Sequence, residues 1–345
     1  MDLVAGVRRP GQPVERVRVL FLFLLMAGCG ASKGEGTGPG ECTDGVDNDA
    51  NGLVDCDDPG CAGSPDCVAE DSGGRGQDSG DSGDSGDTGV IGASPTWMEG
   101  ISWIQVASGD FAMGAIEGDP AASEDELLRM VKFTYDYEIA ATELSLELYT
   151  AAMGETPSPD CGEACPVMGL TWHDAAAVSV ALSEAAGLNP CYSCSVGAGP
   201  TYCVSLNQPQ WCAGYRLPTE AEWERAARAD VATLYAGGDD VDQVAWTSDN
   251  SGGDPRPSGA LQANAWAGYD FSGNVWEWCH DLWMDMPDAT DTVDPTGPIT
   301  GEFRVIRGGG YDADAASART SNRDPLDPAV AGGAVGLRLA RTLNP

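Results

Sequence analysis

The 345-residue chain contains only two histidines, His173 and His280, and has 18 basic residues against 54 acidic ones. Two histidines are too few for a metal centre with three histidine ligands. The formal net charge of −36 opposes nucleic-acid binding, because the phosphates would be repelled. The composition therefore excludes these two function classes and favours a soluble surface protein that attracts divalent cations.

Cysteine is absent from the last part of the chain, since none of the 12 cysteines follows Cys279. Copper(I) is a soft ion that proteins hold through sulfur ligands. Residues 280–345 therefore contain no thiolate with which to bind copper.

The N-terminus has the three successive parts of a secretory signal. Four arginines precede the apolar run Val19–Met26, which is too short to span a bilayer, and small residues follow it. The next residue is Cys29, and this order resembles a bacterial lipoprotein signal. We expect residues 1–28 to be removed and Cys29 to be lipidated, with an ordinary cleaved signal peptide as the alternative. The mature chain would then be exported and anchored in the membrane by lipid, at the outer membrane or cell surface.

Three short segments follow the expected cleavage site. Residues 29–40 are rich in glycine and small polar residues, which predicts a flexible tether. Residues 41–67 are rich in cysteine and aspartate. Residues 68–96 repeat Asp-Ser-Gly and have few apolar residues to bury, so we expect a disordered spacer.

Residues 41–67 have the spacing of an EF-hand-like calcium loop, with Gly52 at its turn. The side chains at its ligand positions carry oxygen: Asp47, Asp49, Asn51, Asp55 and Asp58. So short a segment cannot build its own core, so disulfides are expected to staple it. Its four candidates are Cys42, Cys56, Cys61 and Cys67. The alternative is a solvated acidic loop without a bound ion.

Residues 97–343 are expected to form one large domain. Alternating apolar residues predict two strands, at 103–106 and 109–114, that pair with each other. A helix is predicted over 143–153, and capping residues predict helices that begin at Thr171 and Thr219. Glycine, proline and aspartate dominate beyond residue 229, which predicts long loops. These elements indicate an α+β fold that is rich in loops.

Seven cysteines belong to this domain. We expect disulfides in an exported chain, although the pairing within the last four of the six candidates stays open and a zinc site is the alternative. The six are Cys161, Cys165, Cys191, Cys194, Cys203 and Cys212. The seventh, Cys279, directly follows Trp278 and is expected to be buried and unpaired. We expect no nucleophilic role for it, because the only plausible base is the adjacent His280.

Four blocks of the C-terminal half carry a family resemblance. They are Gly214–Arg228, Tyr269–Trp278, Phe303–Tyr311 and Val335–Ala340. The most specific feature is Gly273-Asn-Val-Trp-Glu-Trp278, in which two tryptophans flank a glutamate. In this order the blocks resemble the sulfatase-modifying factor family, whose founding member is the formylglycine-generating enzyme. The resemblance covers residues 97–343 and implies that family's loop-rich variant of the C-type-lectin-like fold.

The resemblance also shows where this chain departs from active members, which hold copper through two cysteines shortly after an Arg-Gly-Gly-Ser-Tyr segment. At the matching positions this chain has Ala313 and Ala318, and Gly310 replaces the serine. Alanine supplies no donor atom, so we expect no copper and no formylglycine-generating oxidase activity. We therefore expect this chain to have no catalytic residues.

The expected function is binding or scaffolding at the cell surface, with a peptide or a glycan as ligand. A groove beside Trp276, Arg307 and Tyr311 is the expected site. The alternative is a formylglycine-generating oxidase or an enzyme with altered chemistry in the same groove. Its acid or base would then be one of three residues, Glu277, Asp312 or Asp314. The sequence does not determine the oligomeric state.

A structural calcium ion is the cofactor that the resemblance implies for the block around Trp276. By position, its ligands would be the carboxylates of Asp270 and Glu277 and the backbone carbonyls of Gly273 and Val275. Oxygen ligands of this kind suit a hard cation.

Overall fold

The computed structural model describes residues 100–345, except residues 156, 158–160, 163 and 196–199. The predicted signal peptide, Cys29, the calcium segment with its four cysteines and the Asp-Ser-Gly spacer all lie outside the described residues. Within the described part, no helix has the length and hydrophobicity needed to cross a membrane.

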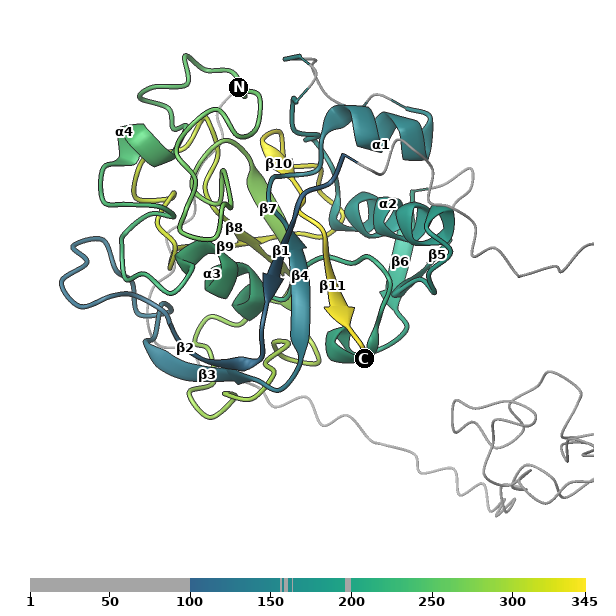
Figure 1. Cartoon of the computed structure of the whole chain (residues 1–345), viewed down its shortest axis with the longest axis horizontal. Helices are drawn as coiled ribbons and strands as arrows, with labels where there is room; N and C mark the ends of the chain where they lie inside the picture. Colours follow the sequence, from purple (N-terminus) through teal and green to yellow (C-terminus); the bar gives the residue numbers. More distant parts are fainter. Residues whose placement is uncertain (1–99, 156, 158–160, 163, 196–199) are drawn as a thin grey trace, which may run out of the picture. The chain divides into compact units, whose positions relative to one another are not determined.

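A three-stranded antiparallel sheet joins the start of the domain to its end (Figure 1). Strand β4 (Asp136–Ala140) lies between β1 (Trp103–Val106) and β11 (Ala340–Leu343). Four successive residues of β4 are buried, and Tyr137 and Ile139 are completely so. A strand buried in this way belongs at the centre of a sheet, which explains its place between the two others.

A four-stranded sheet carries the most specific sequence block. Its order is β10-β7-β8-β9, in which β10 runs parallel to β7 and the other pairs are antiparallel. The strands are β10 (Val335–Gly336), β7 (Trp276–Leu282), β8 (Arg304–Arg307) and β9 (Arg323–Leu326). The sheet thus brings three of the four blocks together.

The expected strands near the start of the domain exist, but their expected pairing is wrong. Strand β2 (Gly109–Met113) pairs with β3 (Arg129–Phe133), whereas β1 pairs with β4. The backbone N–H of Ser108 donates to Asp136, and Gly109 has a φ of 147°. The chain therefore leaves the first sheet at this turn instead of folding back along β1.

The helices follow the predicted capping signals. Helix α2 (Trp172–Ala185) begins at Thr171, and α3 (Glu220–Arg228) begins at Thr219, each with a complete capping box. Helix α1 (Leu146–Met153) ends at Gly154 as expected, but it begins three residues later than predicted because Ser145 is its N-cap. The shift leaves Glu143 outside the helix. The described residues also form a short helix, α4 (Val241–Val244), and a 3₁₀ turn, Pro209–Trp211.

Two hydrophobic clusters form the core of the domain. One surrounds Trp172 of α2 and Trp278 of β7, and the other surrounds Trp223 of α3. All three indole rings are completely buried. The indole N–H groups of Trp172 and Trp278 donate to the carbonyls of Cys279 and Leu170, which satisfies them without water.

The six expected cysteines of the described part form three disulfides. The pairs are Cys161–Cys165, Cys191–Cys212 and Cys194–Cys203. The prediction of disulfides is confirmed, and the pairing leaves no thiolate among them for the alternative zinc site. Strands β5 (Tyr192–Ser195) and β6 (Tyr202–Ser205) form a hairpin. The Cys194–Cys203 bond joins two residues that lie opposite each other on its strands.

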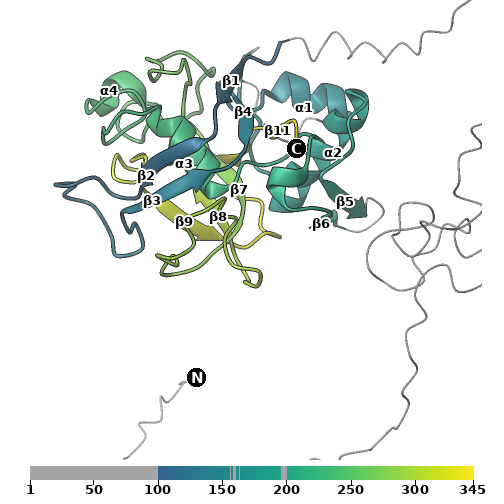
Figure 2. The same ribbon diagram turned by 60° about the horizontal axis from the view of Figure 1, so that its bottom comes forward.

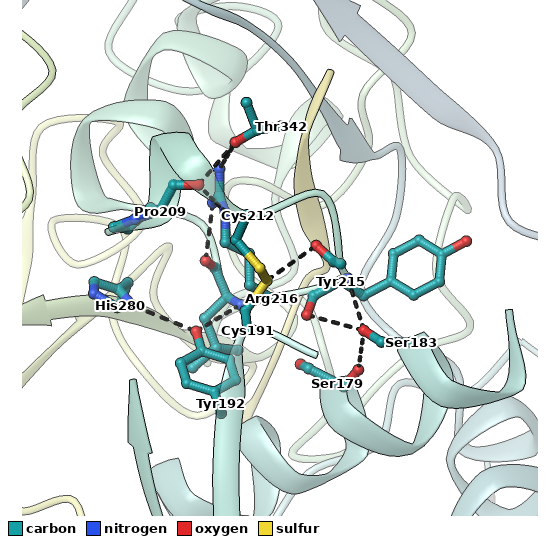
Figure 3. The surroundings of a disulfide bond; sticks show 12 residues. Ser179, Ser183, Cys191, Tyr192, Pro209, Cys212, Tyr215, Arg216, His280 and Thr342 are labelled. Atoms are coloured by element: carbon teal, nitrogen blue, oxygen red, sulfur yellow. Dashed lines mark hydrogen bonds between the residues drawn. A yellow bond between two sulfur atoms is a disulfide. The ribbon is translucent and has the colours of Figure 1, made fainter. Parts of the chain in front are cut away.

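The Cys191–Cys212 bond fastens this hairpin to the centre of the domain (Figure 3). Beside it, Arg216 donates to the carbonyl of Pro209 and to Thr342 of β11. The hydroxyl of Tyr192 accepts from the backbone of Leu217. The disulfide therefore anchors the segment that leads directly into α3.

Candidate functional site

Buried pairs of arginine and glutamate fix the segments around the predicted groove. Arg216 donates two hydrogen bonds of 2.7 Å to the carboxylate of Glu222, and both side chains are buried. The same carboxylate accepts the backbone N–H of Thr219. Glu222 thereby caps α3 and, through Arg216, fixes the segment that precedes the helix.

Arg307 belongs to this buried network and does not line a groove, which corrects its predicted place. Its side chain is completely buried, lies 2.6 Å from Glu224 and stacks over the ring of Trp223. It also donates to backbone carbonyls of the segment 320–322. The reason is the acidic helix α3, which requires a cation on the neighbouring strand β8.

The predicted groove residues Trp276 and Tyr311 lie close together, and both are half-buried. The backbone N–H of Tyr311 donates to the carbonyl of Asn274, two residues before Trp276. A Cβ atom on Gly310 would lie 3.0 Å from the indole Cδ1 of Trp276 and 2.8 Å from the Asp312 carboxylate. The tryptophan ring thus occupies space that a side chain at position 310 would need.

Ala313 and Ala318, the two positions that the resemblance predicts to replace the copper ligands, carry methyl groups only. Ala318 is buried and packs in a small cluster with Tyr235 and Val244. Ala313 is half-buried, and its carbonyl accepts the backbone N–H of Ser248. Among the residues that the structure describes, no group of three His, Cys, Asp or Glu side chains is arranged to hold a metal ion.

Glu277 of the predicted calcium site is completely buried and already paired. Arg338 donates to both of its carboxylate oxygens, one of them at 2.7 Å, and Trp223 donates its indole N–H at 2.7 Å. Arg338 is itself completely buried and stacks on Phe271. Glu277 therefore acts as the counterion of a buried arginine in this structure.

Asp270 is the predicted ligand that keeps a free oxygen. Its Oδ2 accepts the backbone N–H of Gly259 at 2.6 Å, whereas its buried Oδ1 has no partner. Burial raises the pKa of Asp270 to about 6, and the neighbouring charge of Glu277 contributes. An unpaired, buried carboxylate oxygen is a group that a bound cation would satisfy.

Glu143 is a third buried carboxylate beside Asp270 and Glu277, and the sequence did not predict its place there. It accepts hydrogen bonds from the Ser258 hydroxyl and from the side chain and backbone of the segment 274–275. Burial, followed by the charges of Asp270 and Glu277, raises the pKa of Glu143 well above its usual range. Glu277 is paired with Arg338, and the charge of Arg338 also acts on Glu143 and Asp270, so three buried carboxylates share one arginine.

The adjacent residues Cys279, which is buried, and His280, which is half-buried, are chemically quiet. Burial raises the pKa of the Cys279 thiol well above its ordinary value and lowers the pKa of His280 to about 3. The thiol therefore stays protonated and the imidazole neutral near pH 7. Cys279 is unpaired and buried, as expected.

The family model of the sulfatase-modifying factor enzyme 1-like domain matches residues 91–343. The formylglycine-generating enzyme of Streptomyces coelicolor is 31% identical over 281 residues, which cover 69% of this chain and 88% of that enzyme. The chaperone protein LppX of Paenibacillus barcinonensis is 30% identical over 237 residues, which cover 60% of this chain and 80% of that protein.

A solved structure of Treponema denticola variable protein 1 has the same fold. It superposes with a TM-score of 0.62 at 28% identity, and the match covers 70% of this chain and 95% of that one. These similarities, with the mixed sheets and few helices described above, confirm the loop-rich α+β fold that the sequence predicted.

Proposed function

We propose, for a chain that belongs to the sulfatase-modifying factor family, that its domain is a binding or scaffolding module and not a formylglycine-generating oxidase. The observation that carries this proposal is the pair of methyl groups at Ala313 and Ala318, where the family's copper ligands would be. The crowding at Gly310 supports it, because a Cβ atom there would lie 2.8 Å from Asp312 and 3.0 Å from Trp276, so a serine would require these neighbours to shift.

The proposed ligand is a peptide or a glycan that contacts the half-buried rings of Trp276 and Tyr311. Aromatic rings that are apolar on their faces and polar at one edge suit such ligands. Asp312 and Asp314 lie exposed nearby, which favours a ligand that is neutral or positively charged. One relative named above is a chaperone protein, and its name supports a role in binding other proteins.

The oxidase alternative is tested directly by its product. Purified protein incubated with copper and a cysteine-containing sulfatase peptide is expected to leave the thiol unmodified, because Ala313 and Ala318 supply no sulfur ligand for the metal. Mass spectrometry of the peptide measures the result. Aldehyde above a control with copper alone would contradict the proposal and favour the oxidase or an enzyme with altered chemistry.

A double substitution provides the matched gain-of-function control. Ala313→Cys with Ala318→Cys restores two sulfur ligands, so we expect measurable copper(I) binding by this variant. The pair Ala313→Ser with Ala318→Ser changes the same positions without sulfur and should bind no copper. Equal copper binding by the alanine, serine and cysteine forms would show that another site holds the metal.

We further propose that the chain is exported and anchored by lipid on Cys29, at the outer membrane or cell surface. Three disulfides in the described part support an oxidising compartment. Metabolic labelling with a fatty-acid analogue should mark the wild type and Ser32→Ala but not Cys29→Ser. Equal labelling of all three would show that the lipid is elsewhere.

We propose a structural calcium ion at Asp270, held by its free carboxylate oxygen together with the backbone carbonyls of Gly273 and Val275. The support is the unpaired Oδ1 and the three carboxylates around one arginine. Glu277 contributes charge, but Arg338 and Trp223 already use its oxygens.

Chelation is expected to lower the melting temperature of the wild-type protein and to leave Asp270→Asn almost unaffected. Calcium at a hundred times its Kd adds about 2.7 kcal/mol to the free energy of unfolding, which corresponds to a shift of roughly 5–10 °C for a domain of this size. Asp312→Asn, an exposed change, should keep the full sensitivity. Glu277→Ala is unsuitable because it would leave Arg338 buried without a counterion. An unchanged melting temperature of the wild type under chelation would contradict the site.

A further inference from the structure

A surface cavity of about 200 Å³ lies where the C-terminal end of α3 meets the β2-β3 pair. Figure 2 shows α3 beside these two strands. This cavity is lined by Phe111 of β2, by the last turn of α3 and by the segment after that helix. It lies apart from Trp276, Tyr311 and Asp270, so it belongs neither to the proposed groove nor to the proposed calcium site.

Arg225 lines this cavity and is only 7% exposed, yet no carboxylate lies within ion-pair distance of it in the described part of the chain. Its one hydrogen bond of 2.7 Å goes to the carbonyl of Gly109, and its buried Nε–H has no partner. The guanidinium lies 5.8 Å from the ring centres of Phe111 and Phe133. A guanidinium keeps its charge at any ordinary pH, so this cation is buried without a counterion.

The other buried arginines of the described domain all have a carboxylate partner. They are Arg216, Arg228, Arg307, Arg319, Arg323 and Arg338. Burying a charge without a partner costs free energy, which the other buried arginines of the described domain avoid. The exception lies at the wall of a cavity, where a bound anion could supply the missing partner.

The charge of the lining also distinguishes this cavity. Its ionisable residues are Arg225, Arg228 and Asp230, and because Arg228 is paired with Glu224, Arg225 is the cation of this lining without a carboxylate partner. Three further cavities in the described residues are lined by more acidic than basic groups. In a chain with a formal net charge of −36, an unpaired cation in the wall of a cavity favours a ligand of opposite sign.

The remaining wall is apolar. Phe111 forms part of it, and Leu128 and Val231 at the rim are 55% and 45% exposed. Burying these side chains against a ligand would stabilise a complex through the hydrophobic effect. A ligand that satisfies both parts of the wall has an anionic head and a short apolar body.

We propose that this cavity binds a carboxylate attached to a short apolar group, with the Arg225 guanidinium as the partner of the anion. The flat guanidinium fork matches the two oxygens of a carboxylate. Two sources share this chemistry: a free aliphatic acid, and the C-terminal end of a peptide whose last residue is apolar. The inference stands independently of the groove at Trp276 and Tyr311.

The test measures the binding of three probes to the full-length wild-type protein by isothermal titration calorimetry. The probes are 4-methylpentanoate, N-acetyl-glycyl-leucine and the C-terminal amide of that dipeptide. Both acids should bind, and the amide should bind at least about tenfold more weakly than its acid, because it lacks the charge that Arg225 requires. Similar affinities of the two acids indicate a free acid as the natural ligand, whereas a tighter dipeptide indicates a chain end.

Arg225→Met provides the matched variant, since it keeps the length of the side chain and removes its charge. It should weaken binding of both acids at least about tenfold and should melt no lower than the wild type, because the lost cation had no counterion. Arg304→Met is the control. Arg304 also has no ion pair and stacks on a ring, that of Trp172, but it lies outside the cavity. Binding of acid and amide with equal affinity, or no binding of either acid, would overturn the proposal. If Arg225→Met does not fold, the comparison of acid with amide on the wild type still decides the question.

Discussion

Arg338→Met is expected to lower the free energy of unfolding of the domain by about 3–5 kcal/mol, the usual cost of removing one partner from a buried ion pair. Arg338 is completely buried and donates to both oxygens of Glu277. It also donates to the carbonyls of Ala140 and Tyr269, which lie at two different parts of the domain. Its loss would leave Glu277 uncompensated beside two other buried carboxylates. The midpoint of urea unfolding measures the effect.

Two companions separate charge from packing. The double variant Arg338→Met with Glu277→Leu removes both charges and should recover part of the lost stability, as in a double-mutant cycle. Arg341→Met removes an arginine whose pair with Glu138 is partly exposed, so its effect should stay within about 1 kcal/mol. Equal unfolding midpoints for the wild type and Arg338→Met would show that the pair is not required for stability.

Cys191→Ala with Cys212→Ala is expected to destabilise the domain by about 3 kcal/mol through the closed loop alone. The two cysteines are 21 residues apart and both are buried beside the segment that leads into Arg216. Cutting the bond removes the covalent link between the hairpin β5-β6 and the segment before Arg216 and leaves the non-covalent contacts, such as that of Tyr192 with Leu217. Thermal unfolding under oxidising conditions measures the loss.

Cys194→Ala with Cys203→Ala is the matched control, because this pair spans only 9 residues within one hairpin whose strands already pair. A shorter loop restricts the unfolded chain less, so its removal should cost less. A larger loss from this pair than from Cys191 and Cys212 would show that the hairpin, and not its attachment, limits stability.

The local signals of the sequence were sufficient for the starts of α2 and α3 and for the fold family. Thr171 and Thr219 lie three residues before the acids that complete their capping boxes, so both helix starts could be read from neighbouring residues. The Gly273–Trp278 block led to the family for the same reason. The strand pairing of β1 could not be found in this way, because its partner β4 begins 30 residues later in the chain.

The electrostatic centre of the site depended on contacts between distant residues. Glu143 lies 131 residues before Asn274, to which it is hydrogen-bonded. No local pattern marks this glutamate, which follows a strand and precedes a helix. Arg307 was misplaced for a related reason: its partner Glu224 lies 83 residues earlier, on helix α3. Burial of such charges is decided only when the sheets and α3 come together.

The inward placement of the arginines also determines how the outside of the domain behaves in solution. Half of the cationic side chains of the described residues, six of twelve, neutralise glutamates inside the fold, so the solvent-facing shell is left dominated by aspartate and glutamate. Such a shell repels other polyanions over roughly one Debye length, about 8 Å at physiological ionic strength. Encounters with acidic polymers are therefore disfavoured at low salt and become more frequent as salt rises, while positively charged partners are drawn in more weakly under the same change.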